Sequence, residues 1–257
     1  MIEFVNLHNH TTFSAFDGIG YPSDHMDFAY GNGSDALAIT DHGNMNAMSY
    51  QVEHYKSMKA EGKKFKAIYG IEAYFLPSLN DWREEYEKIQ DKKKKTKKKD
   101  FKLSVEDEGE SKKAKDLLRK RSHLILLAQN QTGLNNLFQL VSKSYESENF
   151  YRYPRMDYEM LEEHSEGVIC TSACLGGVFA QDYWNNRDEG ADAVMVAMRV
   201  TAQRFKAIFG DRFYGELQWN LVPEQHELNN YIIDVCAEFS IDLISTADAH
   251  YYHPDLW

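Results

Sequence analysis

The sequence predicts an α/β fold in which seven strands, joined by helices, close into a single barrel. Short apolar runs of strand length alternate with longer segments of helical spacing, which favours parallel strands with helical crossovers. The length of 257 residues is typical of one such barrel, and hydrophobic residues, at 43%, are enough for a sizeable core. Residues that can bind metals lie at nearly every expected strand, and in a barrel these residues would meet at one rim.

The expected strands follow the apolar runs. They are Glu3–Leu7, Ala36–Thr40, Ala67–Tyr74, His123–Ala128, Val168–Thr171, Phe213–Gln218 and Leu243–Thr246. The clearest segments with helical spacing are Asn44–Ala60, Gly133–Ser144, Ala191–Phe209 and Pro223–Phe239. In the last of these, Leu228, Ile232 and Val235 recur on one helical stripe, and Pro223 suits a first turn. No internal repeat or second domain is indicated, so residues 1–257 are expected to form one domain.

A lysine-rich segment separates the third and fourth expected strands. Between Asp81 and Arg121 basic residues outnumber acidic ones, although the whole chain carries a net charge of −11. Like charges are densest from Asp91 to Asp100, where there is almost nothing apolar to bury. We therefore expect a mobile insertion at about residues 91–115. A solvated loop is favoured there over a contact with nucleic acid.

Composition limits the class of protein. No run is long and apolar enough to cross a membrane, and no basic-then-apolar signal segment opens the sequence. Cys170, Cys174 and Cys236 are odd in number and lack a framework spacing, which suggests a reducing compartment, expected to be cytoplasmic. An acidic chain is a poor generic DNA binder, but a site that holds cations needs carboxylates.

The first candidate metal ligands are His8 and His10, with Asp17 just beyond them. Residues two apart on a strand point to the same face, so the two imidazoles would form half of a metal site. Alone this pattern is weak, because a His-x-His motif is often incidental. Its weight comes from similar clusters at the other expected strands.

Five further clusters lie along the chain. One is Glu72, which lies inside an otherwise apolar strand, where a carboxylate is costly unless it is paired or bound to metal. The others are Asp41-His42-Gly43 after the second strand, His123 at the start of the fourth, Cys174 after the fifth, and Asp248 with His250 after the last.

Each cluster also has a structural interpretation. Cys174 could be a small buried apolar residue, His123 a core histidine, and Asp41-His42-Gly43 only a turn. Six such clusters at six strands are hard to explain by turns and cores together, so a polynuclear metal centre is favoured. Mixed imidazole, carboxylate and thiolate ligands suit Zn²⁺, Mn²⁺ or Fe²⁺ better than Mg²⁺. Outside this pattern lie His54, His164, His226 and His253.

The motifs, taken in order, resemble those of the PHP (polymerase and histidinol phosphatase) domain. They are His-x-His, Asp-His-Gly, Gly-x-Glu-x-Tyr, Ser-His-Leu, Ala-Cys-Leu-Gly-Gly and Asp-x-His-Tyr. Within that superfamily, the stretches Asn130–Leu137, Phe209–Gln218 and Pro223–Gln225 resemble the N-terminal domain of the bacterial C-family replicative polymerases, the DNA polymerase III alpha subunits. The resemblance covers nearly the whole chain except the lysine-rich insertion. It implies a distorted seven-stranded TIM-like barrel.

The resemblance also implies a trinuclear metal centre at the C-terminal rim of the strands. It assigns His8, His10, Glu72 and Asp248 to one ion, Asp17, His42 and His250 to a second, and Glu72, His123 and Cys174 to a third. Two to three divalent ions, Zn, Mn or Fe, are therefore expected. Catalysis would depend most on His10, Glu72 and Asp248. Val178 and Trp219-Asn220 depart from the family pattern, which leaves the shape of the pocket and the choice of substrate open.

The function implied by the resemblance is that of a metal-dependent phosphoesterase with 3′-to-5′ exonuclease (proofreading) activity in DNA replication. The expected partners are a single-stranded DNA 3′ end, the polymerase domains of a full-length alpha subunit, which this chain lacks, and other replication proteins. No membrane partner is expected. Two alternatives are a catalytically silent, metal-stabilised scaffold and a small-molecule phosphatase of the histidinol-phosphate type. The complete set of nine ligand positions argues against the first alternative, and the polymerase-type stretches argue against the second.

Overall fold

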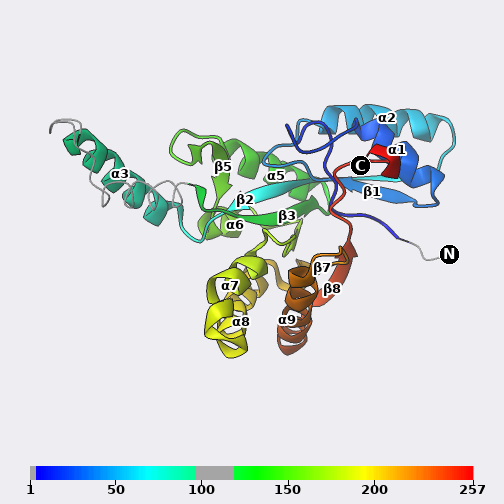
Figure 1. Cartoon of the computed structure of the whole chain (residues 1–257). Helices are drawn as coiled ribbons and strands as arrows, with labels where there is room; N and C mark the ends of the chain where they lie inside the picture. The colour runs from blue at the N-terminus through cyan, green and yellow to red at the C-terminus, as the bar shows by residue number, and fades with distance from the viewer. Residues whose placement is uncertain (1–3, 97–118, 257) are drawn as a thin grey trace.

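The computed structural model describes residues 4–96 and 119–256, without the side chains of residues 92–96. The predicted α/β class is confirmed: eight strands form one curled sheet, and helices pack against it (Figure 1). The strands are β1 (Ala36–Ile39), β2 (Lys66–Phe75), β3 (Ser122–Ala128), β4 (Phe150–Tyr151), β5 (Tyr153–Met156), β6 (Val168–Thr171), β7 (Phe213–Gln218) and β8 (Asp242–Thr246). The sheet order is β4-β5-β2-β3-β6-β7-β8, and β1 also pairs with β2.

The helices fill most of the connections between strands. They are α1 (Pro22–Gly31), α2 (Met48–Ala60), α3 (Leu79–Thr96), α5 (Gln131–Ser144), α6 (Tyr158–Glu163), α7 (Val178–Asn186), α8 (Ala191–Phe209) and α9 (Pro223–Phe239). Short 3₁₀ turns cover Arg187–Glu189, Gly210–Arg212 and Pro254–Leu256. Among the described residues, none of these helices combines the length and apolarity that a membrane span requires.

Six of the predicted strands are confirmed to within one residue at each end: β1, β2, β3, β6, β7 and β8. The short hairpin formed by β4 and β5 was not predicted. The predicted strand Glu3–Leu7 is wrong: Glu3 lies outside the described residues, and residues 4–7 have no regular secondary structure. The prediction of a mobile insertion at 91–115 falls mainly outside the described residues, since its first residues, 91–96, belong to helix α3.

The expectation of a uniformly parallel sheet is wrong at β3, which runs antiparallel to both of its neighbours, β2 and β6. Ser122 at the start of β3 pairs with Phe75 at the end of β2. The connection through α3 therefore leaves and re-enters the sheet at the same end, as in a long hairpin. Helix α3 projects away from the sheet and does not cross over it (Figure 1). The result is a curled half-barrel, consistent with a distorted TIM-like barrel.

The N-terminal segment crosses the open side between β1 and the residues that follow β8. Its carbonyl groups at Asn6 and Asn9 accept hydrogen bonds from Ala38 and Thr40, at 3.1 and 2.9 Å. On the other side, the backbone N–H of His10 donates to the carbonyl of Ala249 at 2.8 Å. These isolated bonds replace a regular ladder, but they hold His8 and His10 beside the end of β8.

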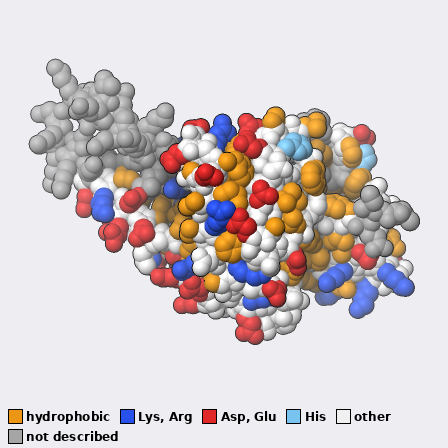
Figure 2. Space-filling view, turned by 90° about the horizontal axis from the view of Figure 1, so that it is seen from below, with side chains coloured by type: hydrophobic (Ala, Val, Ile, Leu, Met, Phe, Trp, Pro, Cys, Tyr) orange, Lys and Arg blue, Asp and Glu red, His pale blue; other side chains and the backbone are white. Residues whose placement is uncertain are grey.

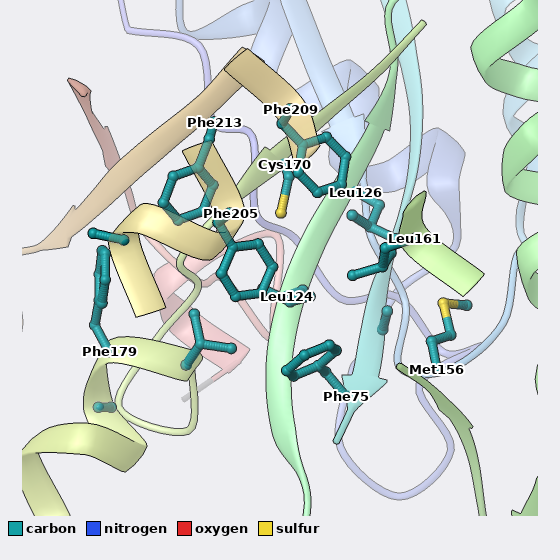
Figure 3. Close-up of a cluster of buried hydrophobic side chains, with 14 of the residues drawn as sticks. Phe75, Leu124, Leu126, Met156, Leu161, Cys170, Phe179, Phe205, Phe209 and Phe213 are labelled. Carbon is teal, nitrogen blue, oxygen red and sulfur yellow. The ribbon is translucent and has the colours of Figure 1, made fainter. Parts of the chain in front are cut away.

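Strand alternation separates a hydrophobic face from the face that carries the polar site. On β2, Ile71, Ala73 and Phe75 belong to the large core beneath α7, α8 and α9, shown in part in Figure 3. Glu72 and Tyr74 therefore point to the opposite, inner face, because successive side chains on a strand alternate. The packing of the helices fixes the sheet, and the sheet fixes the direction of the polar side chains.

Candidate metal centre

The nine predicted ligands form one continuous cluster on the inner face of the sheet. They come from the N-terminal segment (His8, His10 and Asp17), from the turn after β1 (His42), from β2 and β3 (Glu72 and His123), from the turn after β6 (Cys174), and from the segment after β8 (Asp248 and His250). His123 lies at the start of its strand, whereas His42, Cys174 and the pair Asp248 and His250 follow theirs. The antiparallel direction of β3 explains this, because it brings the start of β3 to the rim where its neighbours end.

Glu72 is the hub of the cluster and is fully buried. Its Oε2 lies 2.8 Å from His42 Nδ1 and 3.1 Å from His10 Nε2. Its Oε1 lies 2.7 Å from His123 Nδ1 and 3.7 Å from Cys174 Sγ. A single carboxylate thus touches side chains from four other segments of the chain, so both of its oxygens would be available to hold ions.

Asp248 closes the cluster from the C-terminal side. Its Oδ1 lies 3.1 Å from His8 Nε2 and 3.2 Å from His10 Nε2. The same oxygen is 3.7 Å from His250 Nδ1. The first and last parts of the chain therefore meet at this point.

Asp17 forms the outer edge of the cluster, with about half of its side chain exposed (47%). Its Oδ2 lies 2.8 Å from His42 Nε2 and 3.3 Å from His250 Nε2. The imidazole of His10 stacks against the rings of His42 and His250, with centroids 4.3 and 4.4 Å away. Solvent reaches the cluster from the side of Asp17, while His8 and His10 lie at its buried end.

Five buried polar atoms of the cluster have no hydrogen-bond partner: His8 Nε2, His10 Nε2, His42 Nδ1, Glu72 Oε2 and Asp248 Oδ1. They approach one another to between 2.8 and 3.5 Å, but the contacts lack hydrogen-bond angles. Buried polar atoms without partners are rare and costly, and a shared cation would satisfy all five. The residues present therefore fit a metal.

Three groups of side chains bring their ligand atoms within 4.8 Å of one another. They are His8, His10 and Glu72; His10, His42 and His250; and His42, Glu72 and His123. These groups overlap with the three ligand sets implied by the family resemblance without coinciding with them. Asp17, Cys174 and Asp248 adjoin the groups at the distances given above, so all nine side chains remain candidates.

The charges of the cluster shift the pKa values of its members. Burial lowers the pKa of His10, but contacts with Asp248 and Glu72 outweigh burial and raise the pKa to about 9. Burial raises the pKa of Asp248, but His8 and His10 overcome it and lower that pKa to about 2. At the buried end of the metal-free cluster, His10 and Asp248 thus form an imidazolium–carboxylate pair.

Glu216 on β7 supports the cluster and was not identified from the sequence. It is buried, and its Oε1 lies 2.7 Å from His8 Nδ1, so that Nε2 of His8 faces Glu72 and Asp248. Thr246 donates to the same oxygen at 2.6 Å, and Thr171 donates to Oε2. A carboxylate in this position fixes the orientation and tautomer of a metal-binding histidine. The sequence does contain a sign of this role, because Glu216, like Glu72, is a charged residue inside an apolar strand.

Asp41 holds the loop that carries His10 and Asp17, so it is more than a turn residue. Buried Asp41 accepts hydrogen bonds from the backbone N–H of Thr11 and the hydroxyl of Ser14, both at 2.7 Å. Ser14 Oγ also lies 2.9 Å from His10 Nδ1. Like Glu216 for His8, Ser14 therefore leaves Nε2 of His10 facing the cluster.

The remaining histidines and cysteines named above lie apart from the cluster. His54 pairs with Asp27, and Cys170 and Cys236 are buried free thiols in the hydrophobic core. His164, His226 and His253 make no contact with the candidate ligands in any interaction found among the described residues.

Comparison with known proteins agrees with the family resemblance. The PHP domain family profile matches residues 6–220. The chain is 38% identical over 253 residues to the DNA polymerase III subunit alpha of Aquifex aeolicus, covering 98% of this chain and 19% of that protein. It is 35% identical over 249 residues to the DNA polymerase III subunit alpha of Borreliella burgdorferi, covering 97% of this chain and 18% of that protein. The chain therefore spans about a fifth of the length of these relatives.

A solved structure supports the fold alone. An amidohydrolase from Chromobacterium violaceum superposes with a TM-score of 0.51 at 12% sequence identity, covering 96% of this chain and 87% of the other. At this identity the likeness says nothing about substrate. The candidate ligands Asp248 and His250 lie beyond the stretch matched by the family profile, and the fold brings them to the same cluster.

Metal binding is expected to release protons at pH 7. The pKa of His10 in the metal-free protein is about 9, above its usual value, so this imidazole is protonated at pH 7 and must lose its proton to bind a cation. Calorimetric titration of the chelator-treated protein with Zn²⁺, repeated in buffers of different ionisation enthalpy, should give a buffer-dependent heat. An identical heat in every buffer would contradict this assignment.

Substitution of Glu216 should weaken metal binding without removing a ligand. In Glu216→Gln the contact to His8 Nδ1 loses its charge, and such supporting carboxylates are typically worth about 10- to 100-fold in metal affinity. The measurement is competition for Zn²⁺ with a chromophoric chelator. Glu227→Gln is the control, because Glu227 also accepts a hydrogen bond, from Tyr183, but lies outside the cluster. Equal losses in the two variants would rule out a specific role for Glu216.

Proposed function

The chain belongs to the PHP domain family, and from that premise we propose that it is a metal-dependent phosphoesterase that removes nucleotides from DNA 3′ ends. The observation that carries the proposal is the convergence of five partnerless buried polar atoms from His8, His10, His42, Glu72 and Asp248. A fold held together by hydrophobic packing has no need to bury such atoms, because each one costs stability. The presence of these atoms is explained if they bind the cations that catalyse phosphoester hydrolysis.

We assign the ligands by combining the family pattern with the observed contacts. A first ion would be held by His8, His10, Glu72 and Asp248, a second by Asp17, His42 and His250, and a third by Glu72, His123 and Cys174. Imidazole, carboxylate and thiolate together favour Zn²⁺, Mn²⁺ or Fe²⁺ as the two or three ions. Burial raises the pKa of the Cys174 thiol, and the negative charge of Glu72 raises it further. This thiol would therefore become a good ligand only when a metal displaces its proton.

Such ions, when bound, would polarise a phosphoryl oxygen and make water a better nucleophile at neutral pH. The side chains divide the remaining work. Glu72, His10 and Asp248 would hold the charge of an ion at the buried end, where the low dielectric would strengthen its effect on a phosphate. Glu216 and Ser14 keep the two N-terminal imidazoles oriented. Asp17, half exposed, lies where a substrate would enter.

DNA as the substrate is supported by the relatives and by the need for cations. The relatives from Aquifex aeolicus and Borreliella burgdorferi are subunits of a DNA polymerase, of which this chain would form one part. The chain itself has a net charge of −11, and Figure 2 shows acidic side chains spread over the face seen from below, between scattered Lys and Arg. A polyanion would therefore be attracted chiefly by the bound metals, with the polymerase domains presenting the 3′ end.

Asp248→Asn should abolish hydrolysis while preserving the fold. The amide has the size of the carboxylate but lacks its charge, so the first ion would be lost or misplaced, and loss of one preorganised charged group typically costs about a hundredfold or more in rate. The measurement is Mn²⁺- or Zn²⁺-dependent digestion of 3′-labelled single-stranded DNA, together with metal content and melting temperature. Asp234→Asn, an exposed carboxylate on α9, is the control.

Two outcomes would contradict the proposal. Equal digestion by wild type and Asp248→Asn would assign the activity to a contaminating nuclease. If the metal-loaded wild type hydrolyses neither DNA nor a small phosphomonoester, the chain is a metal-stabilised scaffold. Hydrolysis of the phosphomonoester alone would identify a small-molecule phosphatase.

A further inference from the structure

Phe16 is an exposed aromatic side chain at the edge of the candidate metal centre. Its side chain is fully exposed to solvent, so it gains nothing from hydrophobic burial. Its backbone has φ of 67°, in the left-handed region that bulky residues rarely occupy. Phe16 immediately precedes Asp17, whose carboxylate contacts His42 and His250. Strain and exposure together are unfavourable for folding, so the position calls for a functional explanation.

The turn that carries Phe16 is fixed at both ends by the cluster. On one side the hydroxyl of Ser14 is bound to Asp41, and on the other Asp17 contacts His42 at 2.8 Å. Within the turn, the backbone N–H groups of Asp17 and Gly18 both donate to the carbonyl of Ser14 at 3.0 Å. The ring of Phe16 is therefore attached to a backbone held on both sides, and it is presented to solvent next to Asp17 in the sequence.

Other aromatic side chains extend this edge. Phe13, three residues before Phe16, lies 5.2 Å from the ring of Tyr50 and 6.3 Å from that of Tyr21. Tyr21 and Tyr50 are each about half exposed, at 53% and 49%. The segment that supplies His10 and Asp17 to the cluster thus also supplies exposed aromatic surface.

We propose that Phe16 is the stacking surface for the nucleobase of the 3′-terminal nucleotide, whose phosphate would lie at the metals. This inference rests on the proposed function and names the part of the substrate that the metals do not bind. A nucleotide joins a phosphate, which the metals would bind, to a flat aromatic base, whose face can stack on an exposed ring. Stacking on an aromatic ring accepts every base, as a non-specific exonuclease requires.

The test compares two DNA strands on the metal-loaded chain. Both are short thymidine oligonucleotides with a fluorescent label at the 5′ end and a phosphorothioate at the last linkage to slow cleavage. One lacks the base of its 3′-terminal nucleotide. Wild type should bind the complete strand about fivefold to a hundredfold more tightly, the range expected for one stacked base. Phe16→Ala should bind the two strands equally, and Phe16→Trp should keep the preference.

Further variants separate stacking from other roles. Phe16→Leu keeps an apolar side chain without a ring, so it should lose most of the preference. If it keeps the preference in full, the side chain is an apolar contact, as a docking protein would use, and the stacking proposal fails. Phe138→Ala removes another exposed ring, on α5, and should leave the preference unchanged. Metal content and melting temperature are measured for every variant, to show that the cluster is intact.

Failure of this inference is distinguishable from failure of the proposed function. Equal affinity of wild type for the two strands, with DNA still digested, would overturn the base site and leave the exonuclease. A preference that depends on Phe16, in a metal-loaded chain that digests no DNA, would support the base site and overturn the exonuclease.

Discussion

The structure depends on the side chains that offset the buried charge of one carboxylate, Glu72. Glu72 lies on the inner face of β2 with three imidazole nitrogens within 3.1 Å of its oxygens. An ionised carboxylate at such a depth is tolerated only when charge and hydrogen bonds compensate it. Two features of the fold bring partners to this carboxylate: the antiparallel β3 presents His123, and the N-terminal segment, without a regular ladder, presents His10. A proton on His10, whose pKa is raised to about 9, supplies part of the positive charge, and a cation would also satisfy the buried atoms without hydrogen-bond partners.

The hydrophobic core and the polar cluster are two faces of the same strands. The rings of Phe205, Phe209 and Phe213 stack in the core with centroids 5.0 to 6.4 Å apart, and they lock α8 and β7 together (Figure 3). Glu216 lies three residues after Phe213 on β7, and alternation directs it to the opposite face, where it holds His8. Packing on the helix side therefore sets the positions of ligands on the inner side, which a catalytic site needs to within a fraction of an ångström.

Much of the fold and of the candidate site could be predicted from the sequence, for identifiable reasons. The apolar runs located six strands to within a residue, and the charge at Glu72 inside such a run marked the centre of the cluster. The direction of β3 was missed because periodicity carries no information about direction, although His123 at the start of its strand was a clue. The strand Glu3–Leu7 was wrong because its hydrogen bonds are isolated contacts to β1 and to the segment after β8. Phe16 was missed because exposure and backbone strain have no signature in sequence.

The most direct test of the central claim, that the nine converging side chains are a metal centre, is to locate the ions. Crystals of the chain grown with Mn²⁺ or Zn²⁺ would be measured at the absorption edge of the metal, where anomalous differences reveal the ions themselves. We expect two or three ions about 2.0–2.3 Å from the imidazole, carboxylate and thiolate atoms of the cluster, with one ion between His8, His10, Glu72 and Asp248. A well-ordered cluster without anomalous density, in crystals that hold the metal at saturating concentration, would contradict the claim.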